Sequence, residues 1–176
     1  MTDKIDNKKI RDEFPFLSRE VNKKPIIYLD SAASSQKPRQ VLEQLIKTYS
    51  QGYSNIHRGL HTLSEEATNA YEEVRQKIAR LINAGSKNEV IFTSGATMSL
   101  NLIANSYGLS RLKAGDEILI TVAEHHANII PWQMLCERTG AKLVAVPVDS
   151  GGSFHLTELK KRVNKNTKII SVPHVS

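Results

Sequence analysis

The sequence has little cysteine, no long apolar run and neither of the common glycine patterns for nucleotide binding. A single cysteine in 176 residues excludes an internal disulfide. No apolar run approaches the length of a membrane-spanning helix. After Gly95 the chain reads Ala-Thr-Met-Ser-Leu-Asn, which excludes an NTPase phosphate loop, and the three spaced glycines of a dinucleotide site are missing.

The charge balance is basic, with a formal net charge of +6. The basic residues gather near both ends of the chain, but they neither alternate with aromatic residues nor match a nucleic-acid-binding module. We therefore expect solvated helix faces and no nucleic-acid partner. Residues 1–11 lack the apolar core of a secretory signal, and their acidic side chains argue against a transit peptide. These features favour a cytoplasmic protein without a membrane segment.

The spacing of apolar residues predicts strands that alternate with helices along most of the chain. Short β-branched or aromatic runs predict strands at residues 26–29, 90–92, 118–120, 143–148 and 168–172. Helices are expected to begin near Pro38 and Ser64 and to cover residues 97–107, 130–139 and 156–163. Glycines at positions 52, 85, 108 and 140 are expected to end the first four. This order implies an α/β fold with a mostly parallel sheet and helices on both faces.

The crossing from the expected strand at 90–92 into the next helix is the first candidate for a ligand site. Gly95, Ala96 and Thr97 open that helix, whose first backbone N–H groups have no partner within it. Those donors and the positive end of the helix dipole favour an anion such as phosphate. An ordinary turn between a strand and a helix has the same appearance, so both alternatives stay open at this point.

Three polar segments follow expected strands at their carboxyl ends, where parallel sheets bind ligands. They are residues 95–97, 124–128 and 174–176. Their convergence favours the phosphate site. In the second segment, His125 either stacks on a flat ligand and transfers a proton, or bonds only to local backbone. A zinc site on His57 and His61 is a further possibility, but no cysteine pair or clear carboxylate accompanies them and no metal is expected.

The only cysteine lies on an expected helix with large apolar neighbours. Trp132 and Met134 are expected in the core. Nothing near Cys136 in the sequence would lower the pKa of its thiol, so a buried structural thiol is favoured over a nucleophile.

Five motifs resemble one enzyme family, in the order found there. They are Tyr28-Leu-Asp-Ser-Ala-Ala33, Ile56-His-Arg-Gly-Leu-His-Thr-Leu-Ser64, Ser94-Gly-Ala-Thr97, Glu124-His-His-Ala-Asn-Ile-Ile-Pro-Trp132 and Pro173-His-Val-Ser176. Together they resemble the SUF-type, or group II, cysteine desulfurases, which are pyridoxal 5'-phosphate (PLP) enzymes of fold type I in the class-V aminotransferase group. The resemblance implies an N-terminal arm over residues 1–25 and the first part of a PLP-binding large domain over residues 26–176.

The resemblance implies a role for each matching position. Ala96 and Thr97 would hold the phosphate of PLP, and His125 would stack on the pyridine ring and transfer protons. Ala32 and His57 would lie near the substrate, L-cysteine. The substrate would pass its sulfur to an enzyme persulfide and leave as L-alanine, for iron–sulfur cluster assembly. A SUF-type sulfur acceptor and a second copy of the chain would be the partners.

The sequence also departs from the family pattern. Met98 stands where relatives usually carry glutamate, and we expect this change to be tolerated. The Schiff-base lysine, the acidic partner of the pyridine nitrogen, the persulfide-forming cysteine and the carboxylate-binding arginine would lie beyond Ser176. A truncated N-terminal portion that is inactive alone is therefore expected, with an open sheet edge at its last strand. The alternatives are a selenocysteine lyase or other class-V enzyme, and a non-catalytic chain that dimerises with a longer relative.

Overall fold

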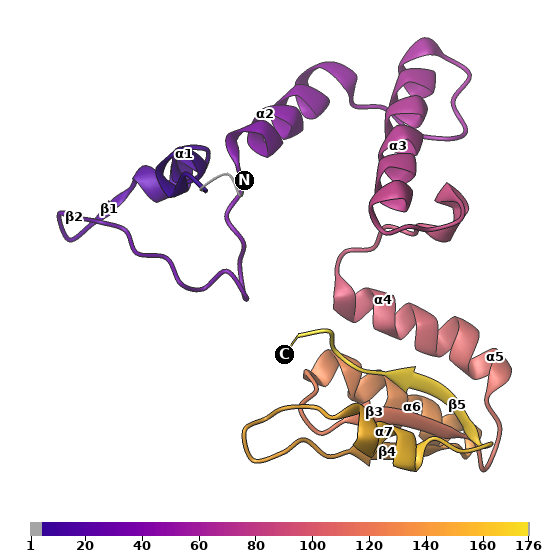
Figure 1. Cartoon of the computed structure of the whole chain (residues 1–176). Helices are drawn as coiled ribbons and strands as arrows, with labels where there is room; N and C mark the ends of the chain where they lie inside the picture. Colours follow the sequence, from indigo (N-terminus) through magenta and orange to yellow (C-terminus); the bar gives the residue numbers. More distant parts are fainter. Residues whose placement is uncertain (1–4, 176) are drawn as a thin grey trace. The chain divides into compact units, whose positions relative to one another are not determined.

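The computed structural model describes residues 5–175, and the chain forms two compact units, residues 1–90 and 91–176 (Figure 1). Residues 1–4 of the predicted arm and Ser176 of the last motif lie outside the described residues. The predicted boundary at residue 25 is not the one that separates these two units. It stays a prediction about the domain organisation.

The first unit is mostly helical and contains one short hairpin. Its elements are α1 (Asn7–Asp12), η1 (Pro15–Ser18), β1 (Glu20–Val21), β2 (Lys24–Pro25), α2 (Arg39–Lys47), η2 (Thr48–Gly52), α3 (Thr62–Leu81) and η3 (Lys87–Glu89). The strands β1 and β2 are antiparallel. The strand predicted at residues 26–29 was wrong, because no strand in the described part of the chain pairs with it. Ile27 and Leu29 are accordingly 82% and 90% exposed.

The two longer helices of this unit lie close to their predicted positions. α2 and the π-helical turn η2 run together to Gly52, which ends the helix as predicted. α3 begins at Thr62 with His61 as its N-cap, so Ser64 lies in its first turn. In α3, Ser64 and Ala79 are buried, each 1% exposed.

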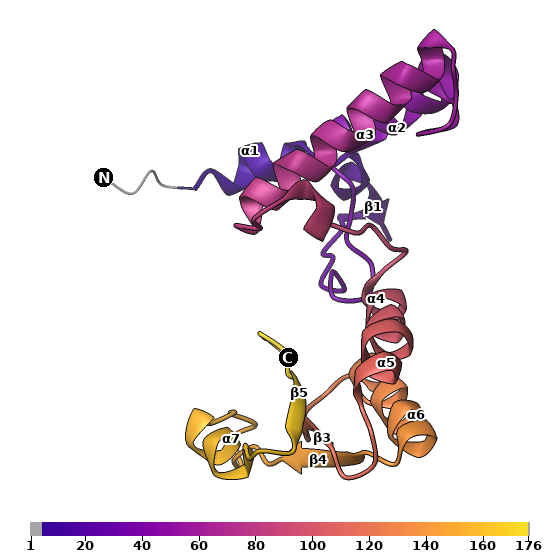
Figure 2. The same cartoon turned by 90° about the vertical axis from the view of Figure 1, so that its right-hand side faces the viewer.

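The second unit is a parallel sheet with helices on both faces. Its elements are α4 (Ala96–Ile103), η4 (Ala104–Gly108), α5 (Leu109–Arg111), β3 (Glu117–Thr121), η5 (His126–Asn128), α6 (Ile130–Thr139), β4 (Lys142–Val146), α7 (Leu156–Arg162) and β5 (Thr167–Ser171). The strand order is β4-β3-β5, and both pairings are parallel. Figure 2 shows α6 on one side of this sheet and α7 on the other. The predicted α/β architecture is therefore confirmed.

The core of the second unit lies between the sheet and α6. Ile118 and Ile120 are two positions apart on β3, so they share one face and pack against Trp132 and Leu135 of α6. Trp132 is 1% exposed, which confirms its predicted place in the core. The prediction that Met134 lies in the core was wrong, since Met134 is 54% exposed. Met134 lies about 200° around the helix from Trp132, on the opposite side.

Two further backbone predictions in this region were wrong. Residues 90–92 pair with no strand among the described residues, and Ile91 is 70% exposed. Gly108 does not end its helix, which continues through η4 and α5 to Arg111. A Cβ at Gly108 would lie 2.4 Å from Leu135 Cδ2. Glycine here lets this helix approach α6 without displacing the Leu135 side chain, and it does not mark a helix end.

Candidate functional site

The N-terminus of α4 presents backbone donors at an open position. Its N-cap, Gly95, has φ 154° and ψ 175°, a conformation that favours glycine, and no side chain caps the helix. The first helical hydrogen bond runs from Ser99 N–H to the Gly95 carbonyl, at 3.1 Å. The N–H groups of Ala96 and Thr97 therefore have no acceptor within the helix. Both residues are exposed, so an anion can reach these donors at the positive end of the helix dipole.

Side-chain hydroxyls brace the turn that leads into α4. Thr93 Oγ1 donates to the Gly95 carbonyl at 3.1 Å and lies 2.7 Å from Ser99 Oγ. Ser94 Oγ donates to Met98 Sδ at 3.3 Å. Met98, the departure from the family pattern, thus takes part in this turn.

The segment that follows β3 is tied to two strands by one carboxylate and one amide. Glu124 Oε1 accepts hydrogen bonds from the hydroxyl and backbone N–H of Thr121, at 2.8 and 3.3 Å. Asn128 Nδ2 donates to Glu124 Oε2 at 2.8 Å and to the Ser171 carbonyl, at the end of β5, at 3.2 Å. Asn128 Oδ1 accepts the indole N–H of Trp132 at 2.8 Å. Glu124, Asn128 and Trp132 therefore fix the shape of this loop.

The loop displays His125 with an exposed ring. Its Nδ1 accepts the backbone N–H of Ala127 at 3.0 Å. Because that N–H only donates, Nδ1 carries no proton, and the neutral ring holds its proton on Nε2. The local backbone bond considered in the sequence is therefore present. It occupies one nitrogen and leaves Nε2 for a ligand, and the ring lies at 83° to that of His126 with centroids 6.4 Å apart.

The two elements next to the predicted cofactor residues are in contact within the second unit. α4, which opens with Ala96 and Thr97, lies in contact with η5, the turn that His125 caps. The bond from Asn128 to Ser171 places η5 at the carboxyl end of β5. This is the edge of a parallel sheet at which ligands bind.

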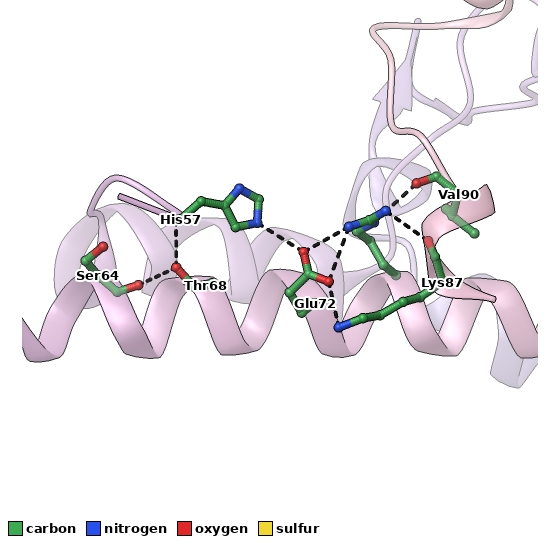
Figure 3. A network of polar contacts seen from close by, with 7 residues as sticks. His57, Ser64, Thr68, Glu72, Lys87 and Val90 are labelled. Atoms are coloured by element: carbon green, nitrogen blue, oxygen red, sulfur yellow. Dashed lines mark hydrogen bonds and ion pairs between the residues drawn. The ribbon is translucent and has the colours of Figure 1, made fainter. Parts of the chain in front are cut away.

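In the first unit, the loop that precedes α3 is fastened along one side of that helix. Ser64, Thr68 and Glu72 follow one another at four-residue spacing, so they lie on the same side. Ser64 Oγ donates to the Asn55 carbonyl at 2.9 Å. Thr68 Oγ1 accepts the backbone N–H of His57 at 2.9 Å, and His57 Nε2 lies 3.0 Å from Glu72 Oε1 (Figure 3).

Glu72 is the centre of a network of charged groups. Arg75 Nη1 donates to both of its oxygens, at 3.0 and 3.2 Å, and Lys87 Nζ lies 2.9 Å from Oε2. Arg75 also donates to the carbonyls of Lys87 and Val90, at 2.9 and 3.2 Å. Hydrogen bonds from Lys87, His57 and Arg75 lower the pKa of Glu72 to about 2. Glu72 is therefore a carboxylate at neutral pH.

A pocket of about 300 Å³ opens beside this loop. It is lined by His57, Gly59, Glu65, Thr68 and Asn69. A Cβ at Gly59 would lie 2.1 Å from Ser64 Oγ, so only glycine lets the loop approach α3 this closely. His57 itself has φ 68°, in the left-handed region.

Ala32 lies in an exposed turn that follows Tyr28. The Tyr28 hydroxyl donates to the carbonyls of Asp30 and Ser34, at 3.2 and 2.5 Å, and so closes the turn around Ala32. The Ser34 N–H also donates to the Asp30 carbonyl, at 3.0 Å. A small side chain on an exposed turn leaves the backbone open to a ligand.

The five predicted site residues fall into two groups. Ala96, Thr97 and His125 belong to the second unit, and Ala32 and His57 belong to the first. In the first group, α4 is in contact with η5. The assembly of all five into one site stays a prediction.

His57 and His61, considered above as zinc ligands, have other partners in the structure. His57 pairs with Glu72, and His61 Nδ1 accepts the Ser64 N–H at 3.3 Å as the N-cap of α3. Within residues 5–175, no group of three or more His, Cys, Asp or Glu side chains could hold a metal ion. None of the helices in that part of the chain is long and apolar enough to cross a membrane.

Cys136 lies on α6 and packs against the core of the second unit. It is half-buried, and this burial raises the pKa of its thiol. The thiol is therefore protonated at neutral pH, which agrees with the structural role expected from the sequence.

Comparison with known protein families identifies the family to which the chain belongs. Residues 27–176 match the family model described as aminotransferase class-V. The chain belongs to the class-V aminotransferase family. This class-V chain is 50% identical over 167 residues to a probable cysteine desulfurase of Synechocystis sp., and 50% identical over 167 residues to a cysteine desulfurase of Cronobacter sakazakii. Each alignment covers 95% of this chain but only 40% and 41% of the two relatives.

Solved structures of cysteine desulfurases share the class-V fold seen here. The apo structure of the enzyme from Thermococcus onnurineus NA1 is 35% identical with a TM-score of 0.88, and the match covers all of this chain (100%) and 42% of that one. The enzyme CsdA from Escherichia coli, in its S-sulfonic acid form, is 35% identical with a TM-score of 0.79, over 95% of this chain and 41% of that one. The chain thus spans about two fifths of the length of the relatives it matches.

Sequence reasoning missed the residues that hold the two histidines in place. Glu72 had a signal, because it continues the four-residue spacing of Ser64 and Thr68 on a predicted helix. Arg75 and Lys87 gave no such signal, since they resemble ordinary solvated charges until the chain folds. Asn128 stands out in the sequence only as part of a motif, and its hydrogen bond to β5 appears only in the tertiary structure.

Proposed function

We propose that this chain supplies cofactor-binding and substrate-binding residues of a PLP-dependent cysteine desulfurase, which takes sulfur from L-cysteine and leaves L-alanine. The observation that carries this proposal is the contact between α4, the helix that begins with Ala96 and Thr97, and η5, the turn that His125 caps. The likeness to cysteine desulfurases supports the choice of reaction. We further propose a cytoplasmic homodimer that passes sulfur to a SUF-type acceptor for iron–sulfur cluster assembly, on the resemblance of the motifs.

The residues that open α4 fit a phosphate group. The N–H groups of Ala96 and Thr97 lack acceptors within the helix, and the Thr97 hydroxyl offers a further donor. Gly95 has open space around the position of a Cβ, so it does not obstruct a bulky anion. When bound, PLP withdraws electrons from the bonds of an amino-acid substrate. Ala96 and Thr97 would orient it through its phosphate.

We propose that His125 supplies an aromatic face and a ring nitrogen to the same site. The bond from Ala127 N–H to Nδ1 fixes the ring and keeps the proton of the neutral form on Nε2. A planar ring of this kind stacks on another planar ring. Nε2 is then the atom at which His125 holds or moves a proton. Ala32 and His57 are proposed to contact the substrate.

A comparison of two cofactor forms tests the phosphate site directly. Trp132 is the only tryptophan, so quenching of its fluorescence reports binding of PLP to the second unit. We expect PLP to bind more tightly than pyridoxal, which has the same ring but no phosphate. Equal affinity of PLP and pyridoxal would contradict the assignment of α4 as the phosphate site.

Ala96→Pro removes one of the proposed phosphate donors and keeps the helix. Proline is tolerated at the first position of a helix, because the N–H that it lacks has no acceptor within the helix. Loss of one hydrogen bond to a charged group, about 1.5–3 kcal/mol, weakens PLP binding about tenfold to a hundredfold. Pyridoxal binding should not change. Leu156→Pro, at the first position of α7, is the matched control and should leave PLP binding intact.

Turnover is tested separately from binding. None of the lysines of residues 1–176 stands in the Ser-His-Lys setting of the family's Schiff-base lysine. We therefore expect residues 1–176 with added PLP to release no L-alanine from L-cysteine. Release of L-alanine by this chain would show that the catalytic lysine has been assigned to the wrong part of the protein.

A further inference from the structure

The proton of His57 is fixed by the charge of its neighbour. The Glu72 carboxyl, held ionised by its cationic partners, only accepts hydrogen bonds. The nitrogen that lies 3.0 Å from Glu72 Oε1, His57 Nε2, must therefore donate. In the neutral ring this leaves the lone pair on Nδ1, and Figure 3 shows the second ring nitrogen of His57 pointing away from α3.

Both ends of this hydrogen bond are held in place. The Glu72 side chain is 21% exposed and accepts hydrogen bonds from Arg75. The Arg75 side chain is 17% exposed and also donates to the carbonyls of Lys87 and Val90. The His57 backbone is held by Thr68, and its ring lies edge-on to Tyr71 with centroids 5.5 Å apart. The ring can therefore turn little without loss of several contacts.

We propose that Glu72 is a positioning residue for His57: it fixes the Nε2–H form of the ring, so that Nδ1 accepts a hydrogen bond from the ammonium or thiol group of an amino-acid substrate. The choice of substrate rests on the proposed function. The two histidines then play complementary parts. His125 keeps Nδ1 engaged with backbone and offers Nε2–H, whereas His57 keeps Nε2–H engaged with Glu72 and offers Nδ1.

The test is NMR spectroscopy of the nitrogen-15-labelled chain, with His57→Gln to assign the ring signals. A ring N–H shielded by a hydrogen bond exchanges slowly enough to give a cross-peak, and we expect one from His57 Nε2–H. Glu72→Ala should abolish it. Glu72→Gln should retain it, because the amide carbonyl still accepts, and this variant separates loss of the acceptor from loss of the fold. Glu73→Gln removes the same charge one residue away on α3 and should leave the cross-peak unchanged.

Two results would overturn the assignment of Glu72. One is a slowly exchanging proton on Nδ1, and the other is an Nε2–H cross-peak that survives in Glu72→Ala while the amide signals of α3 show a folded helix. Titration with L-cysteine adds the substrate test, in which the Nδ1 resonance should shift and the affinity should fall about tenfold in Glu72→Ala. A shift at Nε2 instead of Nδ1 would also refute the proposal. If neither nitrogen responds while the cross-peak behaves as expected, the positioning role of Glu72 is supported and the proposed substrate is wrong.

Discussion

Asn128→Ala should destabilise the second unit far more than the loss of an ordinary asparagine. The Asn128 side chain joins Glu124, Trp132 and the end of β5. Its removal leaves the indole N–H of Trp132, a residue only 1% exposed, without an acceptor. An unsatisfied buried donor costs about 1–3 kcal/mol, and the other lost bonds add about 1 kcal/mol. We therefore expect the free energy of unfolding to fall by about 2–4 kcal/mol.

Urea unfolding followed by the fluorescence of Trp132 measures this change, because the single tryptophan lies in the core of the affected unit. The matched control is Asn101→Ala, in which a half-buried amide loses one hydrogen bond to the Thr97 carbonyl. Its cost should stay within about 0.5 kcal/mol. A loss in Asn128→Ala no larger than in this control would refute the reasoning.

A double variant isolates the cost of leaving the Trp132 indole N–H without an acceptor. Trp132→Phe removes the indole N–H, so Asn128→Ala introduced into that variant no longer leaves this donor buried and unpaired. We expect its cost there to be smaller by about 1–3 kcal/mol. Far-UV circular dichroism replaces fluorescence as the probe, since the tryptophan is gone. An undiminished cost would place the effect of Asn128 elsewhere, in its bonds to Glu124 and β5.

Three further predictions concern other parts of the chain. Gly59→Ala forces a Cβ to within 2.1 Å of Ser64 Oγ, so thermal unfolding should show a loss of about 1–3 kcal/mol, whereas Gly52→Ala, with open space around its Cβ, should change little. Because folding lowers the pKa of Glu72 from 4.5 to about 2, its contribution to stability is present above pH 4.5 and is lost as the pH falls toward 2. Glu72→Gln should therefore flatten the acid limb of the stability curve over that window, and an unchanged acid limb, equal to that of Glu73→Gln, would contradict it. Burial raises the pKa of the Cys136 thiol, so it should react with a disulfide reagent more slowly than free cysteine at neutral pH and accelerate when urea unfolds the chain; equal rates in the folded and unfolded chain would show that Cys136 is accessible.

The three strands of the second unit's sheet could be predicted because each has a strong apolar run and each pairs with another strand among the described residues. β3, β4 and β5 each find a neighbour, and their positions agree with the apolar runs. Residues 26–29 and 90–92 have equally good local patterns, yet neither forms a strand, because a strand exists only where another strand pairs with it. Composition and periodicity do not supply that neighbour.

The roles of the glycines could also be predicted only in part from the local sequence. Gly52 and Gly140 end helices as the sequence indicated, and Gly140 does so in the left-handed conformation. Gly108 and Gly59 look the same in the sequence, but each is needed because another element approaches its Cα closely. The residues that contact a glycine come from tertiary packing, so its purpose could not be read from local sequence.

Some features of the candidate site could be predicted from motifs, whereas others depend on tertiary packing. Spacing and motif resemblance identified His125 and His57, but not the atoms that each ring offers. Those atoms depend on Ala127 and on Glu72, whose bonds appear only in the folded chain. Lys87, which reaches Glu72 from η3, is in turn the largest cause of the lowered pKa of Glu72.

The spacing of Ser64, Thr68 and Glu72 along α3 fixes where the preceding loop can bond to the helix. Each residue of an α-helix turns the chain by about 100°, so one residue inserted between Thr68 and Glu72 would swing the carboxylate about a quarter of a turn away from His57. The anchors at Ser64 and Thr68 would be untouched. The number of residues between Thr68 and Glu72 therefore matters as much as their identity, because an insertion there would break the hydrogen bond between His57 and Glu72.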